Sequence, residues 1–214
     1  MHRTFWVFRR DVVRVAVVAL LAFGLKSVAV AADPEPGQVA QKAIAAVGGE
    51  AKLLRLFRMK ERYNSGAVAA DAEKSTPRES VLEPPQYWWV DGKDRTQEPA
   101  KFAVWGWTLG VLLDPKTVLE TIPGVDERSR KTLGLRASGT VNPPMDLYVD
   151  SETFRLVRLD WREDVYRYSD WREVDGTGYH VRTAIYKKGA AEPWFHHEVV
   201  SVERLPALPE GLSR

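Results

Sequence analysis

The chain has 214 residues, a length that fits one globular domain, and 44% of them are hydrophobic. The net charge of +2 comes from residues 1–31, which hold five of the 31 basic residues but one of the 29 acidic residues. This balance excludes the basic surface typical of nucleic-acid binding, and the absence of cysteine excludes disulfides, thiolate catalysis and a lipid-modified N-terminal cysteine.

Residues 1–31 have the three-part pattern of a secretory signal peptide. A basic start is followed by the apolar run Val15–Leu25 and by a small-residue cleavage site at Ala29–Ala31. We therefore expect a periplasmic or secreted protein from which residues 1–31 are cleaved. An uncleaved inner-membrane anchor is the alternative, although the apolar run is short for a membrane span. The Arg9-Arg10 pair also leaves the twin-arginine route open.

The rest of the chain divides into a linker, one folded domain and a tail. Residues 32–37 are a short Pro-rich linker, residues 38–205 form the domain, and residues 206–214 are predicted to be extended on the surface. The domain begins with a predicted amphipathic helix at Gln38–Val47, whose apolar residues share one face. Gly48-Gly49 ends this helix, as glycine in a left-handed conformation commonly does.

The segment Glu50–Tyr63 fits both helix and strand patterns. We expect a helical turn near Lys52–Leu54 and then a strand from about Leu56 to Asn64, where apolar and charged residues alternate. The small and polar residues of Ser65–Thr76 predict a loop.

Two prolines divide the next strand region. Arg78–Leu82 and Gln86–Val90 are predicted as short strands on either side of Pro84-Pro85, because proline breaks a strand or confines it to an edge. Asp91–Asp94 then has the composition of a turn.

The stretch Glu98–Leu113 is the most hydrophobic part of the chain after residue 31. Its apolar and aromatic residues are too dense to separate helix from strand by period alone. We expect a helix near Lys101–Trp107, followed by a strand at either Leu109–Leu113 or Lys116–Ile122. Pro123–Arg130 is interpreted as a charged turn.

The C-terminal half is predicted to be a meander of antiparallel strands. The strongest signal is Tyr166–Tyr186, in which alternating aromatic and β-branched residues flank the turn Asp175–Gly178. Four further stretches have the same strand character: Lys131–Ser138, Met145–Val149, Phe154–Trp161 and Trp194–Leu205.

Four stretches resemble the periplasmic outer-membrane lipoprotein-sorting superfamily, the LolA/LolB-like proteins. They are the helix end Ala43–Lys52, the strand pair Leu147–Leu159, the hairpin Tyr168–Tyr186 and the closing strand His196–Leu205. The hairpin departs from the family pattern because no proline follows its turn. The tryptophan-rich middle, Trp88–Trp107, has no counterpart in that pattern.

The resemblance implies a mainly β (α+β) fold, in which a curved antiparallel half-barrel sheet has one or two helices covering its concave face. In the family's carriers, the apolar concave face takes acyl chains. The implied function is an exported, non-enzymatic carrier or binding protein that holds an acyl chain, a lipoprotein or another lipophile. The alternative is a cell-envelope module for protein–protein interaction, with a solid aromatic core and no ligand. A cofactor-free enzyme is a third possibility for a sheet of this shape.

Aromatic residues supply the candidate site. Seven of the eight tryptophans lie beyond residue 80, which indicates either a bulky core or a cavity lined by aromatic rings. The predicted cavity-lining residues are Phe57, Met59, Trp88, Trp89, Trp105, Trp107, Trp161 and Phe195. Ordinary core packing is the competing interpretation of the same residues.

The sequence contains no catalytic, cofactor or metal motif that we can assign. His196, His197 and Glu198 are consecutive, so His196 and His197 point to opposite faces of a regular strand. His196 and Glu198 could share a face with His180, but we interpret the cluster as polar residues on the sheet surface. The alternating acidic and arginine residues between Arg158 and Glu173 are interpreted as cross-strand ion pairs on a solvated face.

Overall fold

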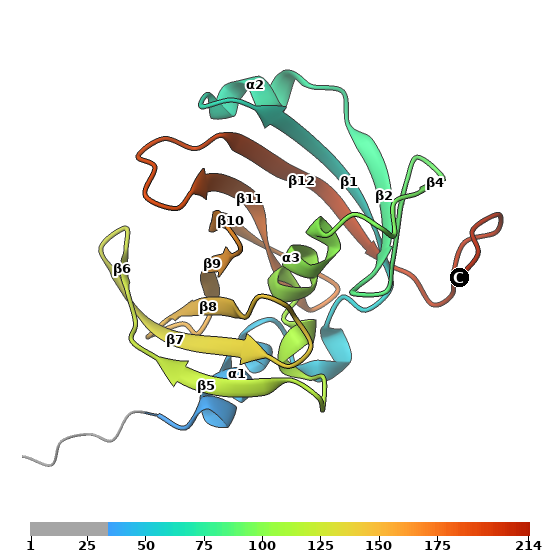
Figure 1. Ribbon diagram of the computed structural model, residues 1–214. Coiled ribbons are helices and arrows are strands. Elements are labelled where there is room, and N and C mark those ends of the chain that lie inside the picture. The colour runs from blue at the N-terminus through green and yellow to red at the C-terminus, as the bar shows by residue number, and fades with distance from the viewer. Residues whose placement is uncertain (1–33) are drawn as a thin grey trace, which may run out of the picture. The chain divides into compact units, whose positions relative to one another are not determined.

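Residues 34–214 are described by the computed structural model, and they form a curved antiparallel sheet with three α-helices (Figure 1). The strands are β1 (Phe57–Ser65), β2 (Arg78–Glu83), β3 (Tyr87–Val90), β4 (Lys93–Asp94), β5 (Val118–Ile122), β6 (Asp126–Glu127), β7 (Arg130–Ser138), β8 (Met145–Asp150), β9 (Leu156–Trp161), β10 (Asp164–Val174), β11 (Thr177–Lys187) and β12 (Phe195–Arg204). The helices are α1 (Pro36–Ala46), α2 (Ala69–Lys74) and α3 (Ala100–Trp107), with 3₁₀ turns at Glu50–Lys52 and Gly110–Leu112. The predicted signal peptide lies outside the described residues.

The sheet consists of two meanders that are joined by the first and last long strands. Its order is β4-β3-β2-β1-β12-β11-β10-β9-β8-β7-β5, and β6 pairs with β7 alone. The edge strands β4 and β5 do not pair with each other, so the sheet stays open although it curves. The expected half-barrel is therefore confirmed. The sequence predicted the C-terminal meander, and the tertiary structure adds the pairing of β1 with β12.

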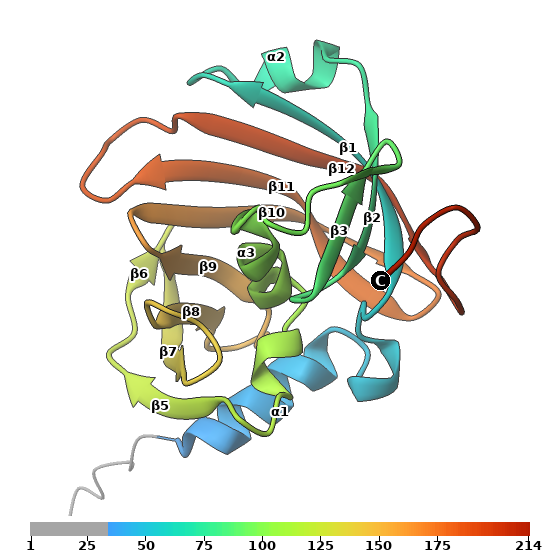
Figure 2. The same ribbon diagram turned by 45° about the vertical axis from the view of Figure 1, so that its right-hand side comes forward.

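Helix α3 lies on the concave side of the curved sheet, against β9 (Figure 2). A side chain at Gly106 would collide with Leu159 of β9 and Met145 of β8, so glycine lets the helix approach the sheet closely. Trp105 is buried in the core that α1 and α3 form with β7–β9. Trp107 packs against both this core and a second core between β1, β2, β3, β11 and β12. Helix α3 thus separates and supports two apolar cores.

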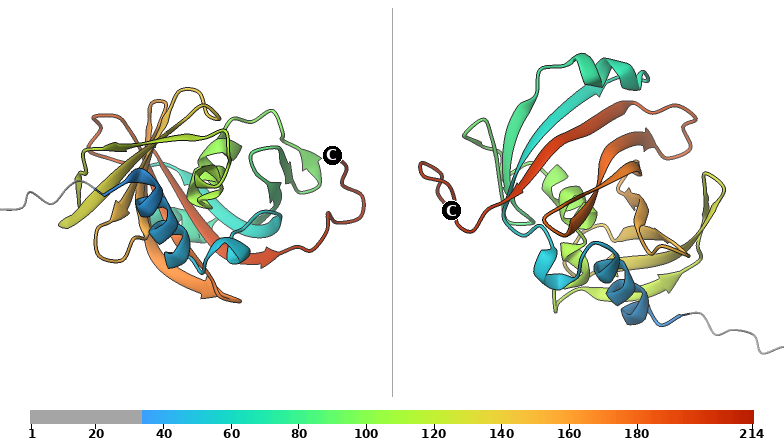
Figure 3. Two further views of the ribbon diagram at one scale, coloured as in Figure 1. Left: turned by 90° about the horizontal axis from the view of Figure 1, so that it is seen from below. Right: turned by 180° about the vertical axis from the view of Figure 1, so that it is seen from behind.

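The other two helices lie far apart, with α1 near the edge strand β5 and α2 beside strands in the middle of the sheet order (Figure 3). The apolar face of α1, including Val39, Ala43 and Ile44, is buried next to β5 and β7. Helix α2 contacts β1 and β12 instead. Among residues 34–214, no helix has the length and apolar character needed to cross a membrane.

Most predicted elements are present with small shifts at their ends, and two predictions are wrong. Helix α2 occupies part of the predicted loop Ser65–Thr76, and β6 occupies part of the predicted turn Pro123–Arg130. Of the two alternatives for the strand after α3, Lys116–Ile122 is confirmed because it contains β5, whereas Gly110–Leu112 within the first alternative is a 3₁₀ turn. Short polar elements such as α2 and β6 carry no period that a sequence pattern can detect, because tertiary contacts hold them.

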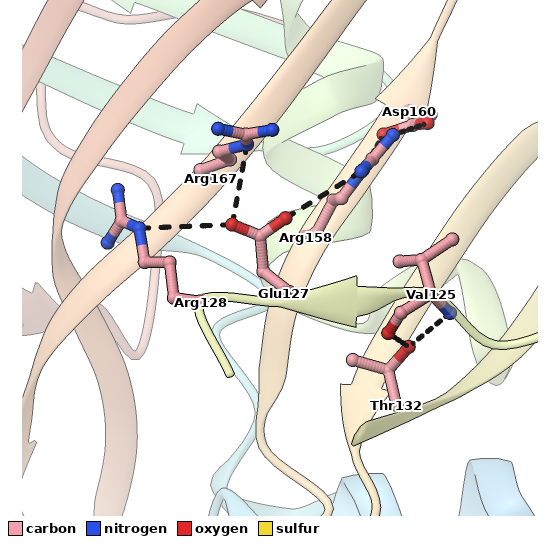
Figure 4. Close-up of polar contacts among 7 residues, drawn as sticks. All are labelled: Val125, Glu127, Arg128, Thr132, Arg158, Asp160 and Arg167. Atoms are coloured by element: carbon pink, nitrogen blue, oxygen red, sulfur yellow. Dashed lines mark hydrogen bonds and ion pairs between the residues drawn. The ribbon is translucent and has the colours of Figure 1, made fainter. Parts of the chain in front are cut away.

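The face of the sheet opposite α3 carries a buried ion-pair cluster (Figure 4). Glu127 of β6 lies 3.6 Å from Arg158, 3.3 Å from Arg167 and 3.8 Å from Arg128. Arg158 also binds Asp160 of its own strand at 2.6 Å. The predicted ion pairs are thus partly correct. Glu127, at the centre of the cluster, was not predicted, because its segment Pro123–Arg130 has the composition of a turn.

Candidate functional site

A cavity of about 330 Å³ lies between α3 and the concave face of the sheet. Its apolar and aromatic residues come from α3 and from six strands of the sheet, and they include Met59, Trp88, Ala103, Trp107, Trp161 and Phe195. The volume is near the lower end of the range of about 300–1,000 Å³ that small-molecule sites occupy. The cavity exists because α3 holds the curved sheet apart without filling the whole concave face.

Five of the eight residues that we predicted line this cavity: Met59, Trp88, Trp107, Trp161 and Phe195. The other three are buried elsewhere. Phe57 is enclosed in the second core, with its ring centroid 6.3 Å from that of Trp107. Trp105 belongs to the first core.

Trp89 misses the cavity because it follows Trp88 directly, and consecutive strand residues point to opposite faces. Its ring stacks on that of Tyr87, with centroids 5.5 Å apart.

One side of the cavity is polar. Glu61, Arg78 and His197 line it, and Ser80 lies behind them; we call these four residues the polar cluster. Oε1 of Glu61 accepts hydrogen bonds from Ser80 Oγ at 2.5 Å and from Arg78 Nε at 2.9 Å. Oε2 of Glu61 lies 2.5 Å from His197 Nε2. Nε1 of Trp88 donates to Ser80 Oγ at 3.2 Å, which links the polar cluster to the apolar lining.

The carboxyl group of Glu61 is ionised at neutral pH although its side chain is only 3% exposed. Burial alone raises its pKa, but the hydrogen bond and charge of His197, the charge of Arg78 and the Ser80 hydroxyl lower the pKa to about 2. An ionised carboxylate only accepts hydrogen bonds, so Nε2 of His197 carries the proton that it shares with Glu61. Glu61 therefore fixes the orientation of both Arg78 and His197.

A β-bulge in β12 brings His197 into the cavity. Lys60 pairs with Ser201, but Glu61 pairs with Val199, so β12 has one extra residue at this point. Val202 and Val199 are consequently both buried on the concave side, and His197, two residues before Val199, shares that side. Without the bulge, the opposite set of β12 side chains would face the cavity.

The interpretation of His197 as a sheet-surface residue is therefore wrong, because its side chain is only 20% exposed and is bonded to Glu61. Sequence reasoning also missed Glu61, Arg78 and Ser80 as parts of a site. A signal for Glu61 was present, because it continues the alternating apolar face of Phe57 and Met59 in β1. A charged residue at one of the alternate strand positions that face inward indicates a functional or structural role on the inner face.

Phe195 of the lining packs between two exposed aromatic side chains. Trp194, which is 42% exposed, lies 5.4 Å from Phe195 between ring centroids, and Tyr63 stacks on Phe195 at 5.7 Å. Deeper in the cavity, burial raises the pKa of Tyr166 and of Tyr168, so both phenols stay neutral at physiological pH.

His180 lies apart from the polar cluster. Its ring centroid is 5.9 Å from that of Tyr168 and 5.0 Å from that of Trp171. Burial lowers its pKa to about 4, against the opposing effect of the Ser169 and Leu156 backbone groups. Within residues 34–214, no three acidic or histidine side chains are grouped so that they could hold a metal ion.

The geometry suits binding better than covalent chemistry. The Ser80 hydroxyl donates a hydrogen bond to the ionised carboxylate of Glu61, and in the described residues no hydrogen bond joins Ser80 to His197. A serine nucleophile needs a base that accepts its proton and is free to pass that proton on. The polar cluster instead holds a guanidinium group and an imidazole in fixed positions beside an apolar cavity.

Comparisons with known proteins give similarity in structure alone. No protein-family profile matches the sequence, and no curated protein matches it. The chain is similar to a structure described as an outer membrane lipoprotein-sorting protein domain from Vibrio parahaemolyticus, with a TM-score of 0.50 and 8% identity over 82% of this chain and 94% of that chain.

Two further structures are more distant. A LolA superfamily protein from Nitrosomonas europaea has a TM-score of 0.46 and 9% identity over 83% of this chain and 96% of its own. A DUF1329 family protein from Desulfovibrio piger has a TM-score of 0.43 and 7% identity over 83% and 96%. The resemblance expected from the sequence is thus confirmed at the level of fold: residues 34–214 have the fold of the outer-membrane lipoprotein-sorting domain.

Proposed function

We propose that this protein is an exported, non-enzymatic carrier or binding protein that holds a lipophile in the cavity beneath α3. The observation that carries the proposal is the cavity itself, because its aromatic and aliphatic walls are already formed and include the exposed side chain of Trp194. An apolar ligand that covers these walls removes apolar surface from water, which lowers the free energy of the complex. The volume of about 330 Å³ suits one acyl chain better than several.

The N-terminal pattern supports export, and the fold suggests one kind of cargo. The Vibrio parahaemolyticus structure is described as lipoprotein-sorting, so lipoprotein acyl chains are one candidate ligand. Fold alone does not define function, since related folds carry unrelated sites. The proposal for this chain therefore rests on the cavity and its lining.

A cavity-filling substitution tests the proposal. Ala103 lies on α3, is buried and lines the cavity, so Ala103→Phe would occupy the space that a ligand needs. Ala45→Phe on the exposed side of α1 is the matched control. We expect single-chain amphiphiles to quench the tryptophan fluorescence of the unmodified protein and of Ala45→Phe. Ala103→Phe should weaken the affinity by at least about tenfold.

Two results would count against lipid binding. The first is a lack of fluorescence change with every amphiphile, together with native mass spectra free of lipid. The second is equal binding by Ala103→Phe and the unmodified protein.

A second candidate function is an interaction module for a protein of the cell envelope. The aromatic group of Tyr63, Trp194 and Phe195 favours it, because Tyr63 and Trp194 are exposed and these residue types are enriched where proteins bind each other. A stable protein complex that Trp194→Ala abolishes, with lipid binding absent throughout, would support this function over the first.

A further inference from the structure

We infer that the polar cluster recognises an anionic head group, so that the ligand class is a single-chain amphiphile with a carboxylate or phosphate at one end. This inference rests on the proposed lipid-binding function. The chain of the ligand would lie on the apolar walls, and its head group would lie against the guanidinium of Arg78.

Arg78 is fixed in place on three sides. Its Nε donates to Glu61 at 2.9 Å, and its guanidinium carbon lies 4.4 Å from the ring centroid of Tyr63 and 5.9 Å from that of Trp88. A guanidinium held at Nε and against aromatic rings is pre-organised, so it loses little entropy on binding an anion. Among the described residues, Glu61 is the only acceptor bonded to this side chain, and its remaining N–H groups suit a bidentate anion.

Glu61 acts as a positioning residue and does not compete with a ligand as an unpaired charge. Its oxygens are engaged by Ser80, Arg78 and His197, and its side chain is only 3% exposed. A buried carboxylate would otherwise repel an anionic head group from the cavity. The cluster contains one carboxylate with a guanidinium and an imidazole, so the charge of Glu61 is already balanced by Arg78.

The second acidic residue of the cavity is also compensated. Asp164 accepts a hydrogen bond of 2.6 Å from Lys187 and one of 3.1 Å from Trp194 Nε1. Arg162, the other basic residue of the lining, lies over the Trp161 ring at 4.4 Å. Each carboxylate in the lining thus has a cationic partner, and the cavity presents a balance of charge that favours an anion.

Exposure sets the direction of the ligand. The side chain of Arg78 is 28% exposed, whereas Met59, Trp161 and Tyr168 are almost completely buried. The head group would therefore lie near the opening with Arg78, and the chain would extend toward the buried aromatic floor. A neutral chain of the same length would fill the same walls and leave the guanidinium without its anion.

Matched ligands separate this inference from the proposed function. Dodecanoate, dodecyl phosphate and dodecanol share one chain and differ in the head group. At about pH 8, where dodecanoate is ionised, we expect an anionic ligand to bind about 10- to 100-fold more tightly than dodecanol by tryptophan fluorescence or calorimetry. The stronger of the two anions identifies the head group as carboxylate or phosphate.

Three other results of this ligand comparison would overturn the inference. Equal affinity for dodecanol and both anions overturns the inference and leaves the proposed function intact. Lack of binding by all three ligands overturns both. An advantage for dodecanol over the anions also overturns the inference, because it shows that the cavity rejects charge.

Three variants test the role of Arg78. Arg78→Lys keeps the charge but loses the bidentate geometry, and the double variant Glu61→Gln/Arg78→Gln removes both charges together so that no buried carboxylate is left unpaired. We expect both to lose the preference for anions while they still bind dodecanol. Arg55→Gln is the matched control, because Arg55 is an exposed arginine that does not line the cavity. Loss of the anion preference in Arg55→Gln, with retention in the Arg78 variants, would overturn the assignment.

Discussion

Nε2 of His197 donates a hydrogen bond of 2.5 Å to Oε2 of Glu61, diagonally across the pairing of β1 with β12. In the pairing register, Glu61 lies opposite Val199, and His197 lies opposite Tyr63. The bond thus connects the first and last long strands of the chain at the wall of the cavity. It depends on the bulge in β12, because that bulge sets which residues of the strand face inward.

Glu61 is expected to stabilise the protein through the contacts that orient Arg78 and His197. Glu61→Gln should lower the free energy of unfolding by about 2 kcal/mol, because it removes a buried charge that accepts three charge-assisted or short hydrogen bonds. Glu203→Gln is the matched control, since Glu203 is 61% exposed and pairs with Arg58 on the same strands. It should change stability by less than about 0.5 kcal/mol. Urea unfolding measures both, and equal effects would contradict a special role for Glu61.

His180 should make the protein sensitive to mild acid. Its pKa is lowered to about 4 in the folded state from 6.5, so the unfolded chain binds the proton more readily. Neutral His180 therefore contributes its full share to the stability of the folded state above about pH 6.5. This contribution is lost as the pH falls toward 4, and the free energy of unfolding is lower by about 2 kcal/mol at about pH 5.

Denaturant unfolding at a series of pH values measures this effect. His180→Phe keeps an aromatic ring between Tyr168 and Trp171 and should flatten the dependence between about pH 6.5 and 5. An unchanged slope in His180→Phe would assign the acid sensitivity to other groups. Glu61, with a pKa of about 2, loses its stabilising charge only below its unfolded pKa of 4.5.

Two adjacent tryptophans provide a matched test of which face of β3 meets the ligand. Trp88 lines the cavity, whereas Trp89 stacks on Tyr87 away from it. Trp88→Phe should reduce the fluorescence change on ligand binding and lower stability by about 1 kcal/mol, since the bond to Ser80 is lost. Trp89→Phe should leave the fluorescence change as it is. A larger effect at Trp89 would show that the ligand binds on the other face.

The turn between β10 and β11 is expected to depend on Gly48, which follows α1. Gly48 has φ +106°, and a side chain there would run into the carbonyl oxygen of Gly176. Gly49 has φ +88° but open space around it. Gly49→Ala should cost about 1 kcal/mol from backbone strain, and Gly48→Ala should cost about 2 kcal/mol more from the collision. Thermal or urea unfolding compares them, and equal losses would mean that the contact adds nothing.

Local patterns predicted most of the elements around the site. The α1 helix, the β10–β11 hairpin, the α3 helix and the strands of the C-terminal meander follow from periods of 3.6 or 2 and from turn residues. The aromatic lining was partly predictable for the same reason, because Met59, Trp88 and Trp107 lie in segments whose hydrophobic character is evident. Trp89 and Trp105 could not be separated from them, since density of apolar residues does not tell which face meets a cavity.

The sequence by itself determined most of the strands and the helices α1 and α3, the lack of cysteine chemistry and the secretory pattern of residues 1–31, because these depend on composition and on neighbours along the chain. The tertiary structure decided which strand pairs with β1 and which side chains of β12 face inward. Strand side chains alternate with a period of two, so one extra residue in β12 reverses their direction. That reversal places His197 beside Glu61, and no local pattern in the sequence specifies it.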